Sequence, residues 1–248
     1  MKKIILFFLF TAQNIFSQAL IPNPPEVSAK SFLLIDAKTK TVITSNNPDE
    51  STGLASITKI MTSYVISDQI SKGFISDDSM VEISEECWRM EGSRMFIKEG
   101  TEVSVSELLK GMIIQSGNDA SCALAEKIAG SQSAFADLMN SYAEQLGLEN
   151  TNFVNPTGLP DINHYSTAND IAKLSIRLIE DFPDNYALFK EKEYTFNNIR
   201  QLNRNSLLWQ DDSIDGIKTG HTNDSGYCLV ASAERDEMRL IAVTLDST

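Results

Sequence analysis

The chain has 248 residues, with 21 Lys and Arg against 34 Asp and Glu, so its formal net charge is −13. This length allows one or two domains with a sizeable core, and 42% hydrophobic against 22% charged residues is the composition of a soluble globular protein. The acidic balance argues against a nucleic-acid partner, because a phosphate backbone needs a concentrated cationic surface. With two His and three Cys, none in a zinc-ribbon spacing, we expect no metal or other cofactor and no disulfide framework.

The first twenty residues have the pattern of a secretory signal. Lys2 and Lys3 give a positive start, residues 4–10 form an unbroken apolar run, and small residues follow at the two positions that a signal peptidase reads. The run is too short for a membrane span, which needs about 20 apolar residues. We therefore predict a cleaved signal over 1–19 and a mature domain over 20–248 that is soluble outside the cytoplasm, without a membrane anchor. Its cysteines are expected to be buried as small apolar side chains.

The elements that follow change in character along the chain. Two β-rich runs at the start are joined by a short polar segment, which predicts a hairpin over 31–36 and 41–45. Apolar residues then recur at helical spacing, and Ser104 is expected to cap one helix. The predicted helices cover 56–70, 104–114, 120–129, 134–146 and 167–179.

Three further strands are predicted near the end of the chain, at 214–220, 226–233 and 238–245. Two strands at the start and three at the end predict one five-stranded antiparallel sheet built from both termini. Helices flank this sheet, and a helical region is inserted between the two groups of strands. The predicted fold class is therefore α+β.

Three short patterns carry the chemistry, namely Ser56-Ile-Thr-Lys59, Ser116-Gly-Asn118 and Lys218-Thr-Gly220. Taken alone, each has a plain interpretation as a helix cap, a turn between helices or a solvated strand residue. Their order and context give them weight, because Ser56 opens a helix, Ser116 lies in a later helix–helix turn, and Lys218 lies on a strand.

Ser56 and Lys59 are separated by three positions, so both side chains emerge on one face of the first helical turn. A serine hydroxyl is a poor nucleophile until a base removes its proton, and an ammonium can be that base only when it is neutral. Burial or a neighbouring cation lowers the pKa of a lysine, and Lys218 is the candidate cation.

The other residues of the three patterns suit the remaining steps of acyl transfer. Ser116 can relay a proton toward a leaving amine, and Asn118 can hydrogen-bond a substrate amide. The N–H groups of Ser56 and His221 are candidate donors of an oxyanion hole.

These motifs resemble those of the low-molecular-mass penicillin-binding proteins, the serine-type D-alanyl-D-alanine carboxypeptidases, and the trio itself is shared with class A β-lactamases. The resemblance extends over most of residues 25–248. It includes the segments 114–120, 164–168, 203–205, 215–222 and 226–233.

The resemblance implies a β-lactamase/DD-peptidase-like fold and a role for each motif. Ser56 is then the acylated nucleophile, Lys59 its base and Ser116 with Asn118 the second motif. The substrate-holding strand carries Lys218, Thr219, Gly220 and His221. The implied reaction removes the terminal D-alanine from peptidoglycan pentapeptide stems in the periplasm, and the same serine is acylated by β-lactams.

Two alternatives stay open. A β-lactamase is the nearest competitor, but Glu149 is not followed by the Leu-Asn pair that the class A deacylation loop requires. The resemblance also implies a further helix, a β-rich domain and a membrane-binding tail after the last strand, so we expect the chain to be truncated at Thr248. A non-catalytic peptidoglycan- or protein-binding remnant of the same fold is therefore the second alternative.

Overall fold

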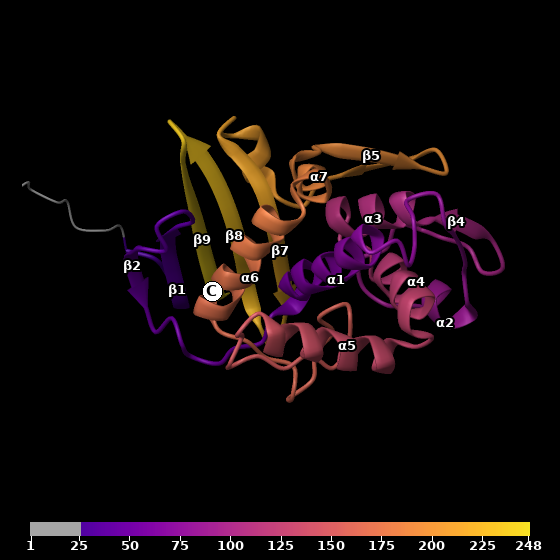
Figure 1. The fold of residues 1–248 in the computed structure, drawn as a ribbon, viewed down its shortest axis with the longest axis horizontal. Helices are drawn as coiled ribbons and strands as arrows, with labels where there is room; N and C mark the ends of the chain where they lie inside the picture. Colours follow the sequence, from indigo (N-terminus) through magenta and orange to yellow (C-terminus); the bar gives the residue numbers. More distant parts are fainter. Residues whose placement is uncertain (1–25) are drawn as a thin grey trace, which may run out of the picture.

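The computed structural model describes residues 26–248, so the predicted signal over 1–19 lies outside the described residues. Figure 1 shows a β-sheet on one side of the molecule and a group of helices on the other. The chain begins in the sheet, passes through the helical region and returns to the sheet. The candidate motifs lie where these two parts meet.

The sheet has five antiparallel strands in the order β2-β1-β9-β8-β7. Their bounds are Ala29–Asp36 (β1), Val42–Asn46 (β2), Ile214–Thr222 (β7), Gly226–Arg235 (β8) and Met238–Ser247 (β9). The first and last of these strands pair directly, with Leu33 opposite Val243. The prediction of one sheet built from both ends of the chain is therefore confirmed.

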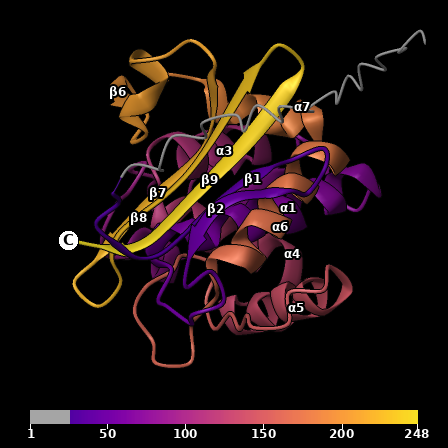
Figure 2. The same cartoon turned by 90° about the vertical axis from the view of Figure 1, so that its left-hand side faces the viewer.

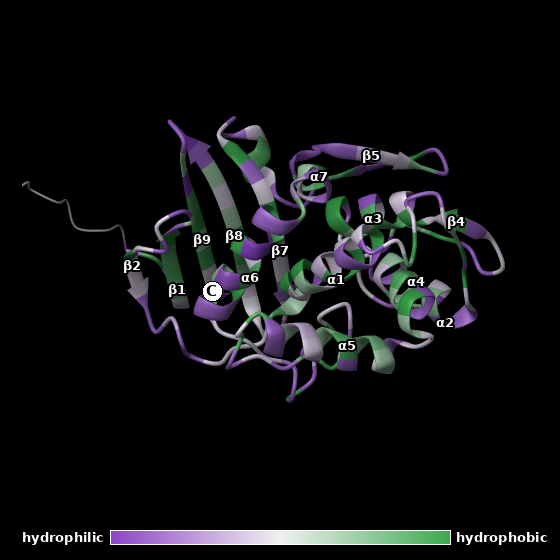
Figure 3. Ribbon diagram, viewed as in Figure 1, coloured by the Kyte–Doolittle hydropathy of each residue, from purple (hydrophilic) through white to green (hydrophobic). Residues whose placement is uncertain are grey.

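Alternation of side chains along these strands gives the sheet two faces. Leu33, Ile35 and Val243 point inward and are buried, and α6 (Ala168–Asp181) packs against β1 and β9 on this side (Figure 2). On the other face Phe32 and Leu34 are only partly buried. Figure 3 shows that β1, β8 and β9 are largely hydrophobic, as strands of a packed sheet should be.

The helical region holds most of the other helices. The α-helices, besides α6, are Lys59–Ser71 (α1), Glu85–Trp88 (α2), Val105–Ile114 (α3), Asn118–Ala129 (α4), Gln132–Gln145 (α5) and Pro183–Tyr186 (α7). Short 3₁₀ turns cover Ala55–Thr58 (η1), Ala187–Lys190 (η2) and Ser206–Trp209 (η3). Within residues 26–248, no helix combines the length and the apolar character that crossing a membrane requires.

Local signals explain where several helices start and stop. The Ser104 side chain accepts a hydrogen bond from the backbone N–H of Glu107 at 3.3 Å, so the predicted cap of α3 is confirmed. Thr167 caps α6 in the same way through the N–H of Asp170. Gly130 ends α4 in the left-handed conformation, with φ of 81°.

Two small two-stranded sheets were not among the predicted elements. One pairs Met80–Glu82 (β3) with Glu102–Ser104 (β4), and the other pairs Glu193–Phe196 (β5) with Ile199–Leu202 (β6). Strands of three or four residues leave too few positions for an alternating pattern to be recognised in the sequence.

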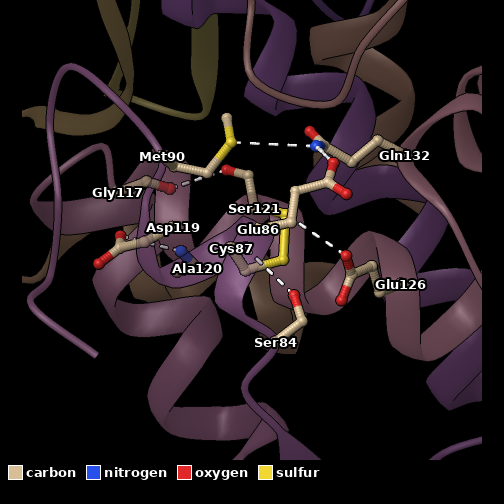
Figure 4. Close-up of a disulfide and its surroundings, with 11 residues drawn as sticks. Ser84, Glu86, Cys87, Met90, Gly117, Asp119, Ala120, Ser121, Glu126 and Gln132 are labelled. Carbon is tan, nitrogen blue, oxygen red and sulfur yellow. Dashed lines mark hydrogen bonds between the residues drawn. A yellow bond between two sulfur atoms is a disulfide. The ribbon is translucent and has the colours of Figure 1, made fainter. Parts of the chain in front are cut away.

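Cys87 and Cys122 form a disulfide, so the expectation of three unpaired, small apolar cysteines is wrong for two of them. An odd number of cysteines excludes complete pairing but not a single bridge, and these two lie 35 positions apart in the sequence. The bridge joins α2 to α4 (Figure 4). Glu126 lies close to both sulfur atoms, but sulfurs bonded to each other are not thiolates and cannot serve as metal ligands. Cys228 is free and buried, as expected.

Breaking this disulfide is expected to lower the free energy of unfolding by about 3 to 4 kcal/mol, the loop-closure entropy of a crosslink of this span. The measurement is urea unfolding of the Cys87→Ala/Cys122→Ala protein beside oxidised wild type. Wild type treated with a reductant should unfold at the urea concentration of the double variant, and the reductant should not change the double variant. Equal midpoints for all samples would show that the bridge does not contribute.

Candidate active site

Ser56 lies in the 3₁₀ turn η1 that leads into α1, and its side chain is not used as a helix cap. In a 3₁₀ turn residues three positions apart are eclipsed, which brings Lys59 Nζ to 3.0 Å from Ser56 Oγ. The turn is held from outside by the 157–158 segment. A Cβ on Gly158 would lie 1.7 Å from the Ala55 carbonyl oxygen, so only glycine allows this contact.

The surroundings of Lys59 suit a neutral amine. The side chain is 1% exposed, and Nζ donates to Asn118 Oδ1 and to the Thr157 carbonyl oxygen, both at 2.7 Å. A neutral amine has two N–H bonds and one lone pair. Because the two N–H bonds are taken by these two oxygens, the lone pair is left for the Ser56 hydroxyl.

Electrostatics favours the same protonation state. Burial lowers the pKa of Lys59 well below its ordinary value, and the positive charge of Lys218 lowers it further, whereas Asp119 acts in the opposite direction. The effect of Lys218 on the pKa of Lys59 is in the direction expected from the sequence.

The second motif lies between α3 and α4. Ser116 has the left-handed φ of 66°, which is uncommon for a residue with a side chain. Its hydroxyl is buried and has no hydrogen-bond partner among residues 26–248. Asn118 begins α4, and its Nδ2 donates to the Glu91 carbonyl oxygen at 2.7 Å. This bond orients the amide so that its oxygen faces Lys59.

The third motif lies on β7, at the edge of the sheet beside η1. Lys218 is 2% exposed and donates to the Thr219 carbonyl oxygen at 3.0 Å. Burial and the charge of Arg204 lower its pKa to about 7. A Cβ on Gly220 would lie 3.0 Å from the backbone nitrogen of Ser56, so glycine allows β7 to approach the serine closely. His221 is exposed, and its ring contacts that of Tyr227.

An open cleft of about 670 Å³ lies in front of these residues. It is lined by Ser56, Ser116, Arg204, Thr219, Gly220 and His221. The buried Lys59, Asn118 and Lys218 lie behind this surface. Hydrogen bonds and cleft lining thus bring all eight residues selected from the sequence into one site.

Arg204 is a cleft residue that the sequence motifs did not single out. Its backbone N–H donates to the Ile114 carbonyl oxygen at 3.2 Å. The flanking Asn203 and Asn205 are buried and hydrogen-bonded to neighbouring backbone, including the bond from Asn205 Nδ2 to the Gly216 carbonyl oxygen. The signal in the sequence is the Asn-Arg-Asn triplet, whose two amides anchor the segment that presents the arginine.

His164 is a buried residue that contacts the turn η1 next to Ser56. Its Nδ1 accepts the Val154 N–H at 3.1 Å, so the neutral ring carries its proton on Nε2, which lies 2.7 Å from Thr58 Oγ1. A second proton on Nδ1 would oppose the Val154 N–H. Burial lowers the pKa of His164 to about 4, against the smaller opposing effect of the Asp161 charge.

A histidine held neutral makes stability depend on pH between its unfolded value of 6.5 and its folded value of about 4. Between pH 6.5 and pH 4, His164 binds a proton in the unfolded chain but not in the folded protein. The free energy of unfolding therefore falls as the pH is lowered. Between pH 7 and pH 4.5 wild type should lose about 2 to 3 kcal/mol more than His164→Gln. Urea unfolding at both pH values measures this difference, and equal losses would contradict it.

This fold is shared with solved penicillin-binding proteins. Penicillin binding protein 5 from Haemophilus influenzae superposes with a TM-score of 0.89 at 44% identity, over 91% of this chain and 67% of that chain. Penicillin-Binding Protein D2 from Listeria monocytogenes, solved in the ampicillin-bound form, superposes with a TM-score of 0.83 at 28% identity, over 91% of this chain and 92% of that chain. The molecule therefore has the penicillin-binding protein fold, as predicted.

The family follows from the sequence. The model of the D-alanyl-D-alanine carboxypeptidase family matches residues 18–248, and the chain belongs to that family. D-alanyl-D-alanine carboxypeptidase DacA of Escherichia coli is 46% identical over 241 residues, which is 94% of this chain. The chain spans 60% of the length of that relative.

Proposed function

We propose that this chain is a serine-type D-alanyl-D-alanine carboxypeptidase that removes the terminal D-alanine from peptidoglycan pentapeptide stems. The observation that carries the proposal is the environment of Lys59. A buried lysine whose two donors are satisfied by carbonyl oxygens, and which lies 3.0 Å from Ser56 Oγ, is equipped to accept a proton from that hydroxyl.

Acylation begins when Ser56 Oγ attacks the carbonyl carbon of the penultimate D-alanine and its proton passes to Lys59 Nζ. The N–H groups of Ser56 and His221 stabilise the oxyanion. The carbon–nitrogen bond to the terminal D-alanine then breaks. The proton held by Lys59 passes through Ser116, whose buried hydroxyl has no other described partner, to the leaving amine, so Lys59 is neutral again.

The substrate is bound by β7 and by the residues around it. Thr219, Gly220 and His221 present the exposed edge of the sheet to an extended peptide. The Asn118 side chain hydrogen-bonds the substrate amide. Lys218 and Arg204 supply positive charge for the terminal carboxylate, which is the group that distinguishes a carboxypeptidase substrate.

Hydrolysis of the ester by water, with Lys59 again as base, releases the shortened stem and regenerates Ser56. β-Lactams would acylate the same serine, as the ampicillin-bound form of the Listeria relative suggests. Glu149 is exposed and does not line the cleft. This supports slow β-lactam hydrolysis, so a carboxypeptidase is favoured over a β-lactamase.

We further propose that residues 1–19 are a cleaved signal, that 20–248 form the catalytic domain, and that the protein acts in the periplasm. The basic and apolar start of the chain supports export. The Cys87–Cys122 disulfide supports it independently, because such bonds persist in oxidising compartments and are rare in the cytosol.

The proposal is tested by incubating the purified protein with a pentapeptide ending in D-Ala-D-Ala and measuring free D-alanine. Wild type should release D-alanine, and Ser56→Ala should not. A pentapeptide ending in D-Ala-L-Ala serves as the substrate control. Binding of the pentapeptide without release would favour the non-catalytic binding module, and rapid turnover of penicillin would favour a β-lactamase.

A further inference from the structure

Asp119 is a buried carboxylate next to the second motif. It follows Asn118 in the first turn of α4 and is 1% exposed. Its Oδ1 accepts the N–H groups of Met95 and Ala120, both at 2.9 Å, and its Oδ2 accepts those of Phe96 and Ile97 at 3.0 and 3.3 Å. Figure 4 shows the carboxylate turned back toward the Ala120 nitrogen at the start of the helix.

The segment held by Asp119 also holds Asn118. Within this segment, residues 91–97, the Glu91 carbonyl oxygen accepts Asn118 Nδ2 and the Ser93 carbonyl oxygen accepts the Asn118 N–H, both at 2.7 Å. Phe96 has the left-handed φ of 68°, a conformation that persists only when neighbouring contacts hold it. Asp119 supplies such a contact at Phe96 and on both sides of it.

Two successive contacts connect Asp119 to Lys59. The 91–97 segment fixes the amide of Asn118, and the amide oxygen accepts from Lys59 Nζ at 2.7 Å. The Asp119 carboxylate therefore acts on the candidate base through Asn118 and does not itself face Ser56 in the cleft.

Asp119 is also a negative charge near several positive ones. The other titratable or charged groups of the site are Lys59 on α1, Lys218 on β7 and Arg204 before η3, and His164 is neutral. Asp119 forms no salt bridge with any residue of 26–248. Its four partners are backbone N–H groups and not cations, so no side chain neutralises its charge, which raises the pKa of Lys59.

We propose that Asp119 is a positioning residue of the active site, which holds residues 95–97 against α4 and so orients Asn118 and Lys59, and which supplies a negative charge that acts on Lys59. The expected change in acylation rate rests on the proposed function. The expected change in the pKa of Lys59 does not.

The sign of the charge effect follows from the neighbours of Lys59. Lys218 lowers the pKa of Lys59 and Asp119 raises it. Removing the Asp119 charge leaves Lys218 unopposed, so Lys59 loses its proton at a lower pH. The acid limb of the acylation profile, which follows the neutral fraction of Lys59, moves to lower pH as well. Loss of positioning lowers the plateau rate by about tenfold or more.

The test compares Asp119→Asn, Asp119→Glu and Asp170→Asn in the full chain. Asp170 is a matched control, because it is 1% exposed, lies in the first turn of α6 and accepts the Asn150 N–H at 2.8 Å, yet does not line the cleft. Two quantities are measured against pH. They are the acylation rate with a fluorescent penicillin and the NMR titration of the Lys59 side chain, assigned with Lys59→Arg.

Asp119→Asn should move both midpoints to lower pH and reduce the plateau. Asp119→Glu keeps the charge but changes its position, so it should reduce the plateau with the midpoints near wild type, and it remains informative if Asp119→Asn does not fold. Asp170→Asn should leave midpoints and plateau unchanged. An unchanged Lys59 titration in Asp119→Asn, or a midpoint shifted equally by Asp119→Glu, would overturn the inference. If wild type is not acylated but Lys59 titrates as expected, the proposed function fails and the inference stands.

Discussion

Lys59→Ala is expected to acylate about 10²- to 10⁴-fold more slowly than wild type with a fluorescent penicillin, the usual contribution of a general base. Wild-type Lys59 offers its lone pair to Ser56 Oγ at 3.0 Å, and alanine offers none. The Asn118 amide and the Thr157 carbonyl also lose their common donor, so positioning is lost together with the base.

The appropriate control is a lysine outside the site. Lys173 lies on α6 and forms a half-exposed ion pair with Asp170, so Lys173→Ala should be acylated at the wild-type rate. Thermal unfolding of both variants shows whether the fold survives. A folded Lys59→Ala protein that is acylated as fast as wild type would exclude Lys59 as the base.

Lys218→Met is the second substitution with a large expected effect. It keeps the length of a buried side chain but removes a charge that should bind the developing anion and the substrate carboxylate. The plateau rate of acylation should fall by about 10²- to 10³-fold, as when one preorganised electrostatic group is deleted.

The pH profile of acylation of Lys218→Met gives a second, independent prediction, which is the direction in which the acid limb moves. The positive charge of Lys218 lowers the pKa of Lys59, so its removal raises that pKa and less Lys59 is neutral at a given pH. The acid limb of the acylation profile should therefore move to higher pH, opposite to Asp119→Asn. A limb that stays in place would mean that the two lysines do not interact.

The sheet and the long helices could be predicted because their patterns are continuous. Nearly continuous apolar runs in β8 and β9 indicate strands, and the Ser104 cap marks the start of α3. The short strands of the β3–β4 and β5–β6 sheets have no such pattern. The Cys87–Cys122 bond depends on α2 and α4 lying side by side, which the local sequence does not express.

Some residues of the candidate site could likewise be predicted from the sequence, and others could not. Ser56 and Lys59 could be paired from their spacing, because three positions along one turn fix their relation. Thr157 and Arg204 reach the site only through tertiary contacts. Asp119 follows Asn118 in the sequence, but its hydrogen bonds to residues 95–97 also depend on the fold. The depressed pKa of Lys59 has burial as its largest cause, and burial is a property of the folded chain.

The most direct test of the central claim is peptide mass mapping of the protein after brief treatment with penicillin. The account predicts one penicilloyl adduct, on the peptide that carries Ser56, and none on the Ser56→Ala protein treated in parallel. An adduct on a different residue, or no adduct on correctly folded wild type, would contradict the assignment of Ser56 as the nucleophile.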